Sequence, residues 1–291
     1  MKFFNRFLSA SLLLVSATTS ANFTDRVLPH IYYVSFESQT ESGSITLSGQ
    51  YRLPRQEHNA PVPAVIIAHS SGGVDSTGKW YARSLNKLGI ATLELDMWSP
   101  RGFVGGTNDR PQTVQETIPD AYAALDFLAA KPEIDADNIG IIGFSWGGVV
   151  AMLSATEHYY QLSRTSENKF AAHIAHYPVC WSYNFLPGFE FNDLVGSPIM
   201  IQIGGKDDYE ADPLSCENFV QALPIETQSL VTLNNYKNGH HAWDRLEASL
   251  RVFDIFGNRG QGAEVDLIGN RKIAKKSRNA VNEFFLTHLT E

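Results

Sequence analysis

Residues 143–148 read Gly-Phe-Ser-Trp-Gly-Gly and place Ser145 inside the pattern G-x-S-x-G. A strand-like run at 138–142 precedes this motif, and small residues typical of a helix follow it at 147–155. The order of strand, sharp turn and helix is what a nucleophile elbow needs, because it exposes the hydroxyl at the head of a helix. The motif therefore predicts that Ser145 is a nucleophile. The alternative is a glycine-rich strand-to-helix turn in another kind of α/β protein.

A serine hydroxyl becomes a good nucleophile only when a base removes its proton and an acid orients that base. Asp207 and Asp208 follow a strand-like run at 198–203, and His240 and His241 follow the last such run. The carboxyl ends of parallel strands meet at one edge of a sheet, so these groups are expected to lie near Ser145. The residues alone leave open which aspartate and which histidine take part.

An oxyanion hole needs two backbone N–H donors. One is expected at Trp146, directly after the nucleophile, and the other at Ser70 or Ser71, in the turn after the strand-like run 62–68. Three further histidines are possible bases, but they lie on or beside earlier strands, which favours structural roles for His69, His173 and His176.

The elements that must position these groups follow from hydrophobic periodicity. Strands are expected at 30–36, 44–53, 62–68, 90–95, 138–142, 171–177, 198–203 and 230–233, and helices at 80–88, 113–130, 147–155, 214–223 and 272–289. Strands that alternate with helices predict an α/β fold with a mostly parallel sheet and helices on both faces. The stretch 97–110 is expected to be a long loop, and long loops in compact domains are often functional.

The N-terminus has the composition of a secretory signal peptide. Lys2 and Arg6 precede a short apolar run, and small residues follow up to Ala21. The sequence thus predicts a signal peptide at 1–21, cleaved near Ala21, a single domain over 22–291, and a secreted or periplasmic protein. The apolar run is too short to span a bilayer, so no stable membrane insertion is expected. The net charge of −8 argues against a nucleic-acid partner.

The chain contains two cysteines, Cys180 and Cys216. Export to an oxidising compartment favours a disulfide between them, although two buried thiols remain the alternative.

Other chemistries have weaker support. Residues 73–79 match the nucleotide-binding pattern G-x-x-x-x-G-K, but Trp80 occupies the place of the magnesium-binding serine or threonine. The sequence shows no metal-ligand spacing, and neither a metal nor a cofactor is expected. A binding protein on an inactive hydrolase scaffold is a third possibility.

Several motifs together resemble the dienelactone hydrolase family of α/β-hydrolases. They lie at 69–73, 96–102, 143–148, 177–178, 204–208 and 241–244. The resemblance implies an α/β-hydrolase fold, with Asp207 as the acid and His241 as the base. It also implies that Arg101 borders the substrate site. Aromatic residues such as Trp98 are candidates for lining the pocket.

The chain departs from the family pattern at two places. Ser145 stands where the namesake enzymes carry a cysteine, and His69-Ser70 replaces a usual His-Gly pair. The first departure favours ordinary ester hydrolysis. The sequence therefore predicts a serine hydrolase with the triad Ser145, Asp207 and His241, an oxyanion hole at Trp146 and Ser71, and a small-molecule ester or lactone substrate. Peptidase, amidase or acyltransferase activity would use the same triad, and the oligomeric state is left open.

Overall fold

The computed structural model describes residues 28–40, 43–55 and 60–290, and the predicted signal peptide lies outside them. Its centre is an eight-stranded sheet in the order β1-β2-β4-β3-β5-β6-β7-β8. The strands of this sheet are β1 (His30–Thr40), β2 (Gly43–Leu53), β3 (Val62–Ala68), β4 (Ala91–Asp96), β5 (Ile134–Phe144), β6 (Ala172–His176), β7 (Ile199–Lys206) and β8 (Val231–His240). β2 pairs antiparallel with β1 and β4, and the remaining neighbours run parallel.

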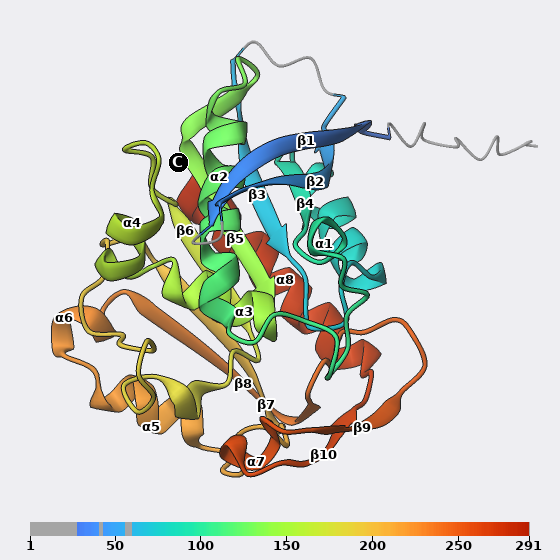
Figure 1. The fold of residues 1–291 in the computed structure, drawn as a ribbon, viewed down its shortest axis with the longest axis vertical. Helices are drawn as coiled ribbons and strands as arrows, with labels where there is room; N and C mark the ends of the chain where they lie inside the picture. The colour runs from blue at the N-terminus through green and yellow to red at the C-terminus, as the bar shows by residue number, and fades with distance from the viewer. Residues whose placement is uncertain (1–27, 41–42, 56–59, 291) are drawn as a thin grey trace, which may run out of the picture.

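Helices cover both faces of the sheet. The helices are α1 (Ser76–Asn86), α2 (Ile118–Ala129), α3 (Trp146–Leu153), α4 (Glu157–Ser163), α5 (Ser215–Ala222), α6 (Ile225–Gln228), α7 (Gly257–Gly260) and α8 (Arg271–Leu289). Figure 1 shows α2 and α3 in front of the sheet and α8 behind it, with α1 packed against α8. The prediction of a mostly parallel sheet with helices on both faces is confirmed.

Burial explains why the central strands form. β3 is apolar along its whole length, and almost every residue of β3 and β6 is buried, as expected for strands covered on both faces. α8 is amphipathic, and its apolar side packs on β5 and β6 through Phe285 and its neighbours. The helix therefore closes the sheet behind the strand that leads to Ser145.

Several predicted boundaries were wrong. α1 begins at Ser76 rather than residue 80, because the Asp75 carboxylate accepts the Thr77 N–H and caps the helix. β8 continues to His240 instead of ending at residue 233, since pairing with β7 compensates for its polar sequence. The loop at 97–110 contains a short 3-10 helix, Ser99–Arg101.

A two-stranded hairpin between β8 and α8 was not predicted. Its strands are β9 (Leu250–Asp254) and β10 (Ala263–Leu267), joined through α7. Figure 1 places the hairpin and α7 together beyond one end of the sheet, and Leu267 forms a bridge with His241. Among the described residues, no helix combines the length and the apolar character needed to cross a membrane.

Candidate active site

Ser145 lies on a strained turn between β5 and α3. Its backbone has φ 50° and ψ −109°, a conformation that non-glycine residues rarely adopt. A side chain on Gly143 would clash with the backbone of Gly147, and one on Gly147 would clash with the backbone of Ala68. Only glycines therefore let the strand and the helix come close enough for this turn, which matches the elbow predicted from the sequence.

The three side chains of the predicted triad form a continuous hydrogen-bonded chain. His241 Nε2 lies 2.9 Å from Ser145 Oγ, and His241 Nδ1 lies 2.7 Å from Asp207 Oδ2. All three residues are buried. Asp207 lies directly after β7 and His241 directly after β8, so the carboxyl ends of neighbouring strands deliver them to one place. A carboxylate at Nδ1 favours the tautomer with the proton on Nδ1, and in that tautomer Nε2 can accept a proton.

The neighbouring aspartate and histidine make no hydrogen bond to Ser145 in the described part of the chain. Asp208 accepts the backbone N–H of Asp266 at 2.8 Å and so binds the β9–β10 hairpin. His240 is the last residue of β8, and its Nδ1 has no hydrogen-bond partner within the described part of the chain. The structure thus brings Asp207 and His241 to Ser145.

The remaining candidate histidines have structural partners. His69 Nε2 accepts the N–H of Met97 at 3.0 Å, and burial lowers the pKa of His69 to about 4. Burial also lowers the pKa of His173 to about 4, and its Nδ1 lies 3.0 Å from the Ala151 carbonyl. Both imidazoles are therefore neutral at ordinary pH, and neither contacts Ser145.

A buried carboxylate supports the loop that carries His241. Asp244 accepts hydrogen bonds from Tyr81 and Tyr177, both at 2.8 Å, and its Oδ2 lies 3.0 Å from His176 Nδ1. Tyr177 also packs against the His241 ring at 4.6 Å. Since Asp244 is three residues after His241, this network fixes the position of the imidazole. Sequence reasoning did not assign Asp244 a role, although it lies in the quoted motif at 241–244.

The predicted oxyanion donors face the same space. Ser71 and Trp146 both line a cavity with Ser145. Within the described residues, the backbone N–H groups of Ser71 and Trp146 have no hydrogen-bond acceptor. The Gly147 N–H donates to the His69 carbonyl at 3.1 Å, and this contact holds the turn at 69–73 against the head of α3.

Arg101 and Trp98 lie outside the cavities at Ser145. The Arg101 guanidinium binds the buried Asp120 carboxylate at 2.7 and 3.0 Å, so it connects the loop at 97–110 to α2. Trp98 is buried, donates to the Ser71 carbonyl at 3.0 Å and packs edge-on against Trp146 at 5.3 Å. Trp98 therefore supports the turn at Ser71 from behind, and the implied position of Arg101 beside the substrate is not seen.

A different arginine borders the site. Arg110 Nη1 donates to Ser71 Oγ at 2.7 Å, and Nη2 binds both carboxylate oxygens of Asp254 at 2.9 and 3.0 Å. Tyr209 donates to Asp254 at 2.8 Å, and its ring packs on His241 at 4.4 Å. This buried network joins the β9–β10 hairpin to the turn at Ser71. This network was not predicted from the sequence, although the alternation of apolar and polar residues from Leu250 to Val252 could have indicated a strand leading to Asp254.

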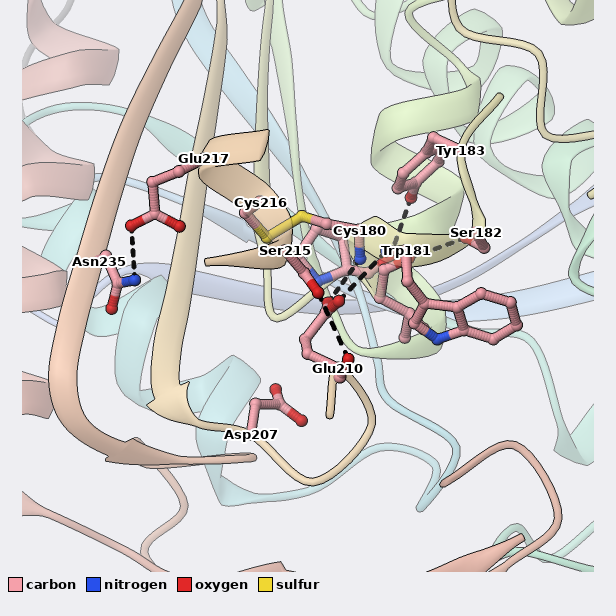
Figure 2. Close-up of a disulfide and its surroundings, with 12 residues drawn as sticks. Cys180, Trp181, Ser182, Tyr183, Asp207, Glu210, Ser215, Cys216, Glu217 and Asn235 are labelled. Atoms are coloured by element: carbon pink, nitrogen blue, oxygen red, sulfur yellow. Dashed lines mark hydrogen bonds between the residues drawn. A yellow bond between two sulfur atoms is a disulfide. The ribbon is translucent and has the colours of Figure 1, made fainter. Parts of the chain in front are cut away.

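Cys180 and Cys216 form a disulfide, which confirms the predicted pairing. Figure 2 shows Glu210 beneath this bond, on the turn that also carries Asp207. The Glu210 carboxylate accepts the N–H groups of Cys180 and Trp181 at 2.5 and 3.1 Å. Burial, assisted by the charge of Asp207, raises the pKa of Glu210 to about 8. The disulfide and Glu210 together join the segment after β6 to the turn that holds the triad acid.

Two cavities open beside Ser145. One has a volume of about 640 Å³ and the other about 520 Å³, and Ser71, Ser145, Tyr209 and Asp254 line both. Cavities of this size accommodate small molecules. A serine activated by an imidazole, beside free N–H groups and a ligand-sized space, can carry out acyl transfer.

Comparison with known proteins gives a consistent result. The model of the dienelactone hydrolase family matches residues 51–289. A protein of Methylorubrum extorquens, provisionally named a carboxymethylenebutenolidase, is 26% identical over 132 residues, which cover 38% of this chain and 45% of that protein. A protein of Bradyrhizobium sp, provisionally named a lactonase, is 33% identical over 110 residues, which cover 35% of this chain and 44% of that protein. The matched stretches thus span less than half of either relative.

Solved structures share the fold over most of the chain. The dienelactone hydrolase of Anabaena variabilis superimposes with a TM-score of 0.57 at 18% identity, covering 90% of this chain and 99% of that one. At this identity the likeness shows the fold alone.

Proposed function

Because the chain belongs to the dienelactone hydrolase family, we propose that it is a secreted serine hydrolase that cleaves carboxylic esters or lactones. The observation that carries the proposal is the hydrogen-bonded chain from Ser145 Oγ through His241 to Asp207. The serine proton can move to His241 during attack on a carbonyl while Asp207 stabilises the imidazolium that forms, and no cofactor is needed.

The reaction proceeds in two halves. Ser145 Oγ attacks the carbonyl carbon while His241 Nε2 takes its proton, and the N–H groups of Trp146 and Ser71 bind the developing oxyanion. His241 then passes the proton to the leaving alcohol, and an acyl-enzyme remains. Water, deprotonated by His241, attacks this ester, and His241 returns the proton to Ser145 Oγ as the acid is released. Asp207 stabilises the imidazolium in both halves.

The test uses an active-site probe and matched variants. A fluorophosphonate should label the wild-type protein and should not label a Ser145→Ala variant. Replacing Ser145 or His241 by alanine should lower kcat for a short-chain aryl ester by about 10⁴-fold or more. Folded wild-type protein that resists the probe would contradict the mechanism and favour an inactive scaffold that only binds ligands. Comparing ester and amide substrates of the same acid separates esterase from amidase activity.

Secretion belongs to the same proposal. The disulfide between Cys180 and Cys216 agrees with an oxidising compartment, and residues 1–21 have the composition of a signal peptide. N-terminal sequencing of exported protein should give a chain that starts at residue 22. An unprocessed N-terminus on a protein retained in the reducing cytoplasm would refute this part.

A further inference from the structure

The two cavities beside Ser145 differ in which members of the triad they contact. Ser145 lines both, but His241 and Ala242 line only the cavity of about 520 Å³. During acyl-enzyme formation, His241 must hand its proton to the oxygen of the leaving alcohol, so that alcohol must lie on the His241 side. The cavity of about 640 Å³ is left for the acyl group. We refer to them below as the alcohol cavity and the acyl cavity.

The walls of the acyl cavity are mainly apolar. They include Val114, Val149, Val179, Leu186, Phe189 and Phe256. Burying an alkyl or aromatic acyl group there removes apolar surface from water, which stabilises binding. This cavity therefore suits an apolar acyl group.

The walls of the alcohol cavity carry carboxylates. Asp75 and Glu247 lie at its exposed side, and Glu94, which is only 5% exposed, lies deeper. Glu94 Oε2 accepts from Arg52 at 2.8 Å, whereas Oε1 makes no hydrogen bond within the described part of the chain. A carboxylate oxygen only accepts hydrogen bonds, so an unpartnered one on a residue that lines the cavity favours a ligand that donates.

A glycine in α1 makes room for this carboxylate. Gly78 also lines the alcohol cavity, and a side chain at this position would clash with Glu94 Oε1. Glycine inside a helix destabilises the helix relative to alanine. Glycine at position 78 therefore lets the Glu94 carboxylate reach the cavity, although it makes the helix less stable.

We propose that the substrate is an ester of an apolar acid with a hydroxyl-rich alcohol of the glycerol or sugar class. This inference rests on the proposed function and specifies its substrate. The hydroxyls of the alcohol donate to Glu94 and Asp75, while the acyl chain occupies the apolar cavity.

The charge of the alcohol cavity favours a neutral polyol over a cationic alcohol. Glu94 is paired with Arg52, and Asp254 is paired with Arg110. Arg245 adds a further positive charge to the wall. The cavity is thus rich in acceptors without a large excess of negative charge, and a quaternary ammonium has no N–H to donate to them.

The experiment compares three esters of octanoic acid: 1-monooctanoylglycerol, propyl octanoate and octanoylcholine. The kcat/KM of wild-type protein should be at least tenfold higher for the glycerol ester than for the propyl ester. This preference ratio should fall threefold or more in Asp75→Asn and in Glu94→Gln. Asparagine caps a helix as well as aspartate does, so Asp75→Asn should keep α1 intact. This variant therefore tests the inference even if Glu94→Gln fails to fold beside the buried Arg52.

Asp212 supplies a matched control, because its carboxylate has the same chemistry but lies away from both cavities. Asp212 accepts the Leu214 N–H at 2.9 Å, much as Asp75 accepts the Thr77 N–H at 2.8 Å, but Asp212 lines neither cavity. Asp212→Asn should leave the preference ratio unchanged.

The possible outcomes separate this inference from the proposed function. Protein that a fluorophosphonate labels at Ser145, but that does not prefer the glycerol ester, overturns the inference alone. A preference for octanoylcholine shows that the cavity selects a cation, which also overturns it. Protein that is neither labelled nor active on any ester refutes the proposed function and the inference together.

Discussion

Arg110 offers the strongest test of how the β9–β10 hairpin is held at the site. Its side chain is 6% exposed, and that of its partner Asp254 is fully buried. Arg110→Ala would leave the Asp254 carboxylate without a positive charge, and breaking a buried pair in this way costs about 3–5 kcal/mol. Tyr209 and the Phe256 N–H still donate to Asp254, so we expect a loss near the lower end, about 3 kcal/mol. In a chain of this size that corresponds to a decrease in Tm of roughly 6–12 °C.

Urea unfolding followed by circular dichroism measures this loss, and an exposed pair on the same hairpin supplies the control. Arg251 binds Asp266 across β9 and β10, but its side chain is 64% exposed. Arg251→Ala should therefore produce no measurable change, because water screens such pairs. Arg110→Ala should also lower kcat/KM, since Arg110 holds Ser71 at 2.7 Å. If the two variants proved equally stable, the hairpin would not depend on the buried pair.

Three further predictions concern the surroundings of the triad. The folded-state pKa of Glu210 is raised to about 8, so stability from its bound proton is present at pH 4 and is lost as pH rises to about 8. The free energy of unfolding of Glu210→Gln should thus rise by a few kcal/mol relative to that of wild type between pH 5 and pH 8. If urea unfolding gave the same pH dependence for both proteins, this prediction would be wrong. Replacing Cys180 and Cys216 together by alanine removes the link between residues at a sequence separation of 36. By the chain-entropy model, this should lower the free energy of unfolding by about 4 kcal/mol. Wild-type protein that unfolds at the same urea concentration with and without a reductant would argue against this value. Leu186→Trp should fill part of the acyl cavity and lower kcat/KM for octanoyl esters at least tenfold relative to acetyl esters, and an unchanged chain-length profile would show that the acyl chain lies elsewhere.

Where a local motif directly follows a strand, the sequence predicted which residues the structure brings together at the site. The elbow at Ser145 depends on glycines at fixed offsets, and Asp207 and His241 follow strands that run parallel. Parallel pairing delivers such residues to one edge of the sheet whatever their distance in the chain. The choice of Asp207 over Asp208, and of His241 over His240, came from the family resemblance.

The sequence was less informative where a residue's role depends on distant partners. Arg101 and Arg110 lie in the same loop, and only the positions of Asp120 and Asp254 decide which of them reaches the site. The strand that carries Asp254 is short, and its partner strand lies beyond a glycine-rich turn. β8 is polar along much of its length, so no hydrophobic pattern marks its extension to His240.

The proposed mechanism requires a covalent acyl intermediate on Ser145. Intact-protein mass spectrometry of wild type, quenched in acid during turnover of an octanoyl ester, can detect this intermediate. We expect a species heavier by one octanoyl group, located on the peptide that contains Ser145 and absent from Ser145→Ala. Turnover at full rate by Ser145→Ala, or an acyl group found only on another residue, would contradict it.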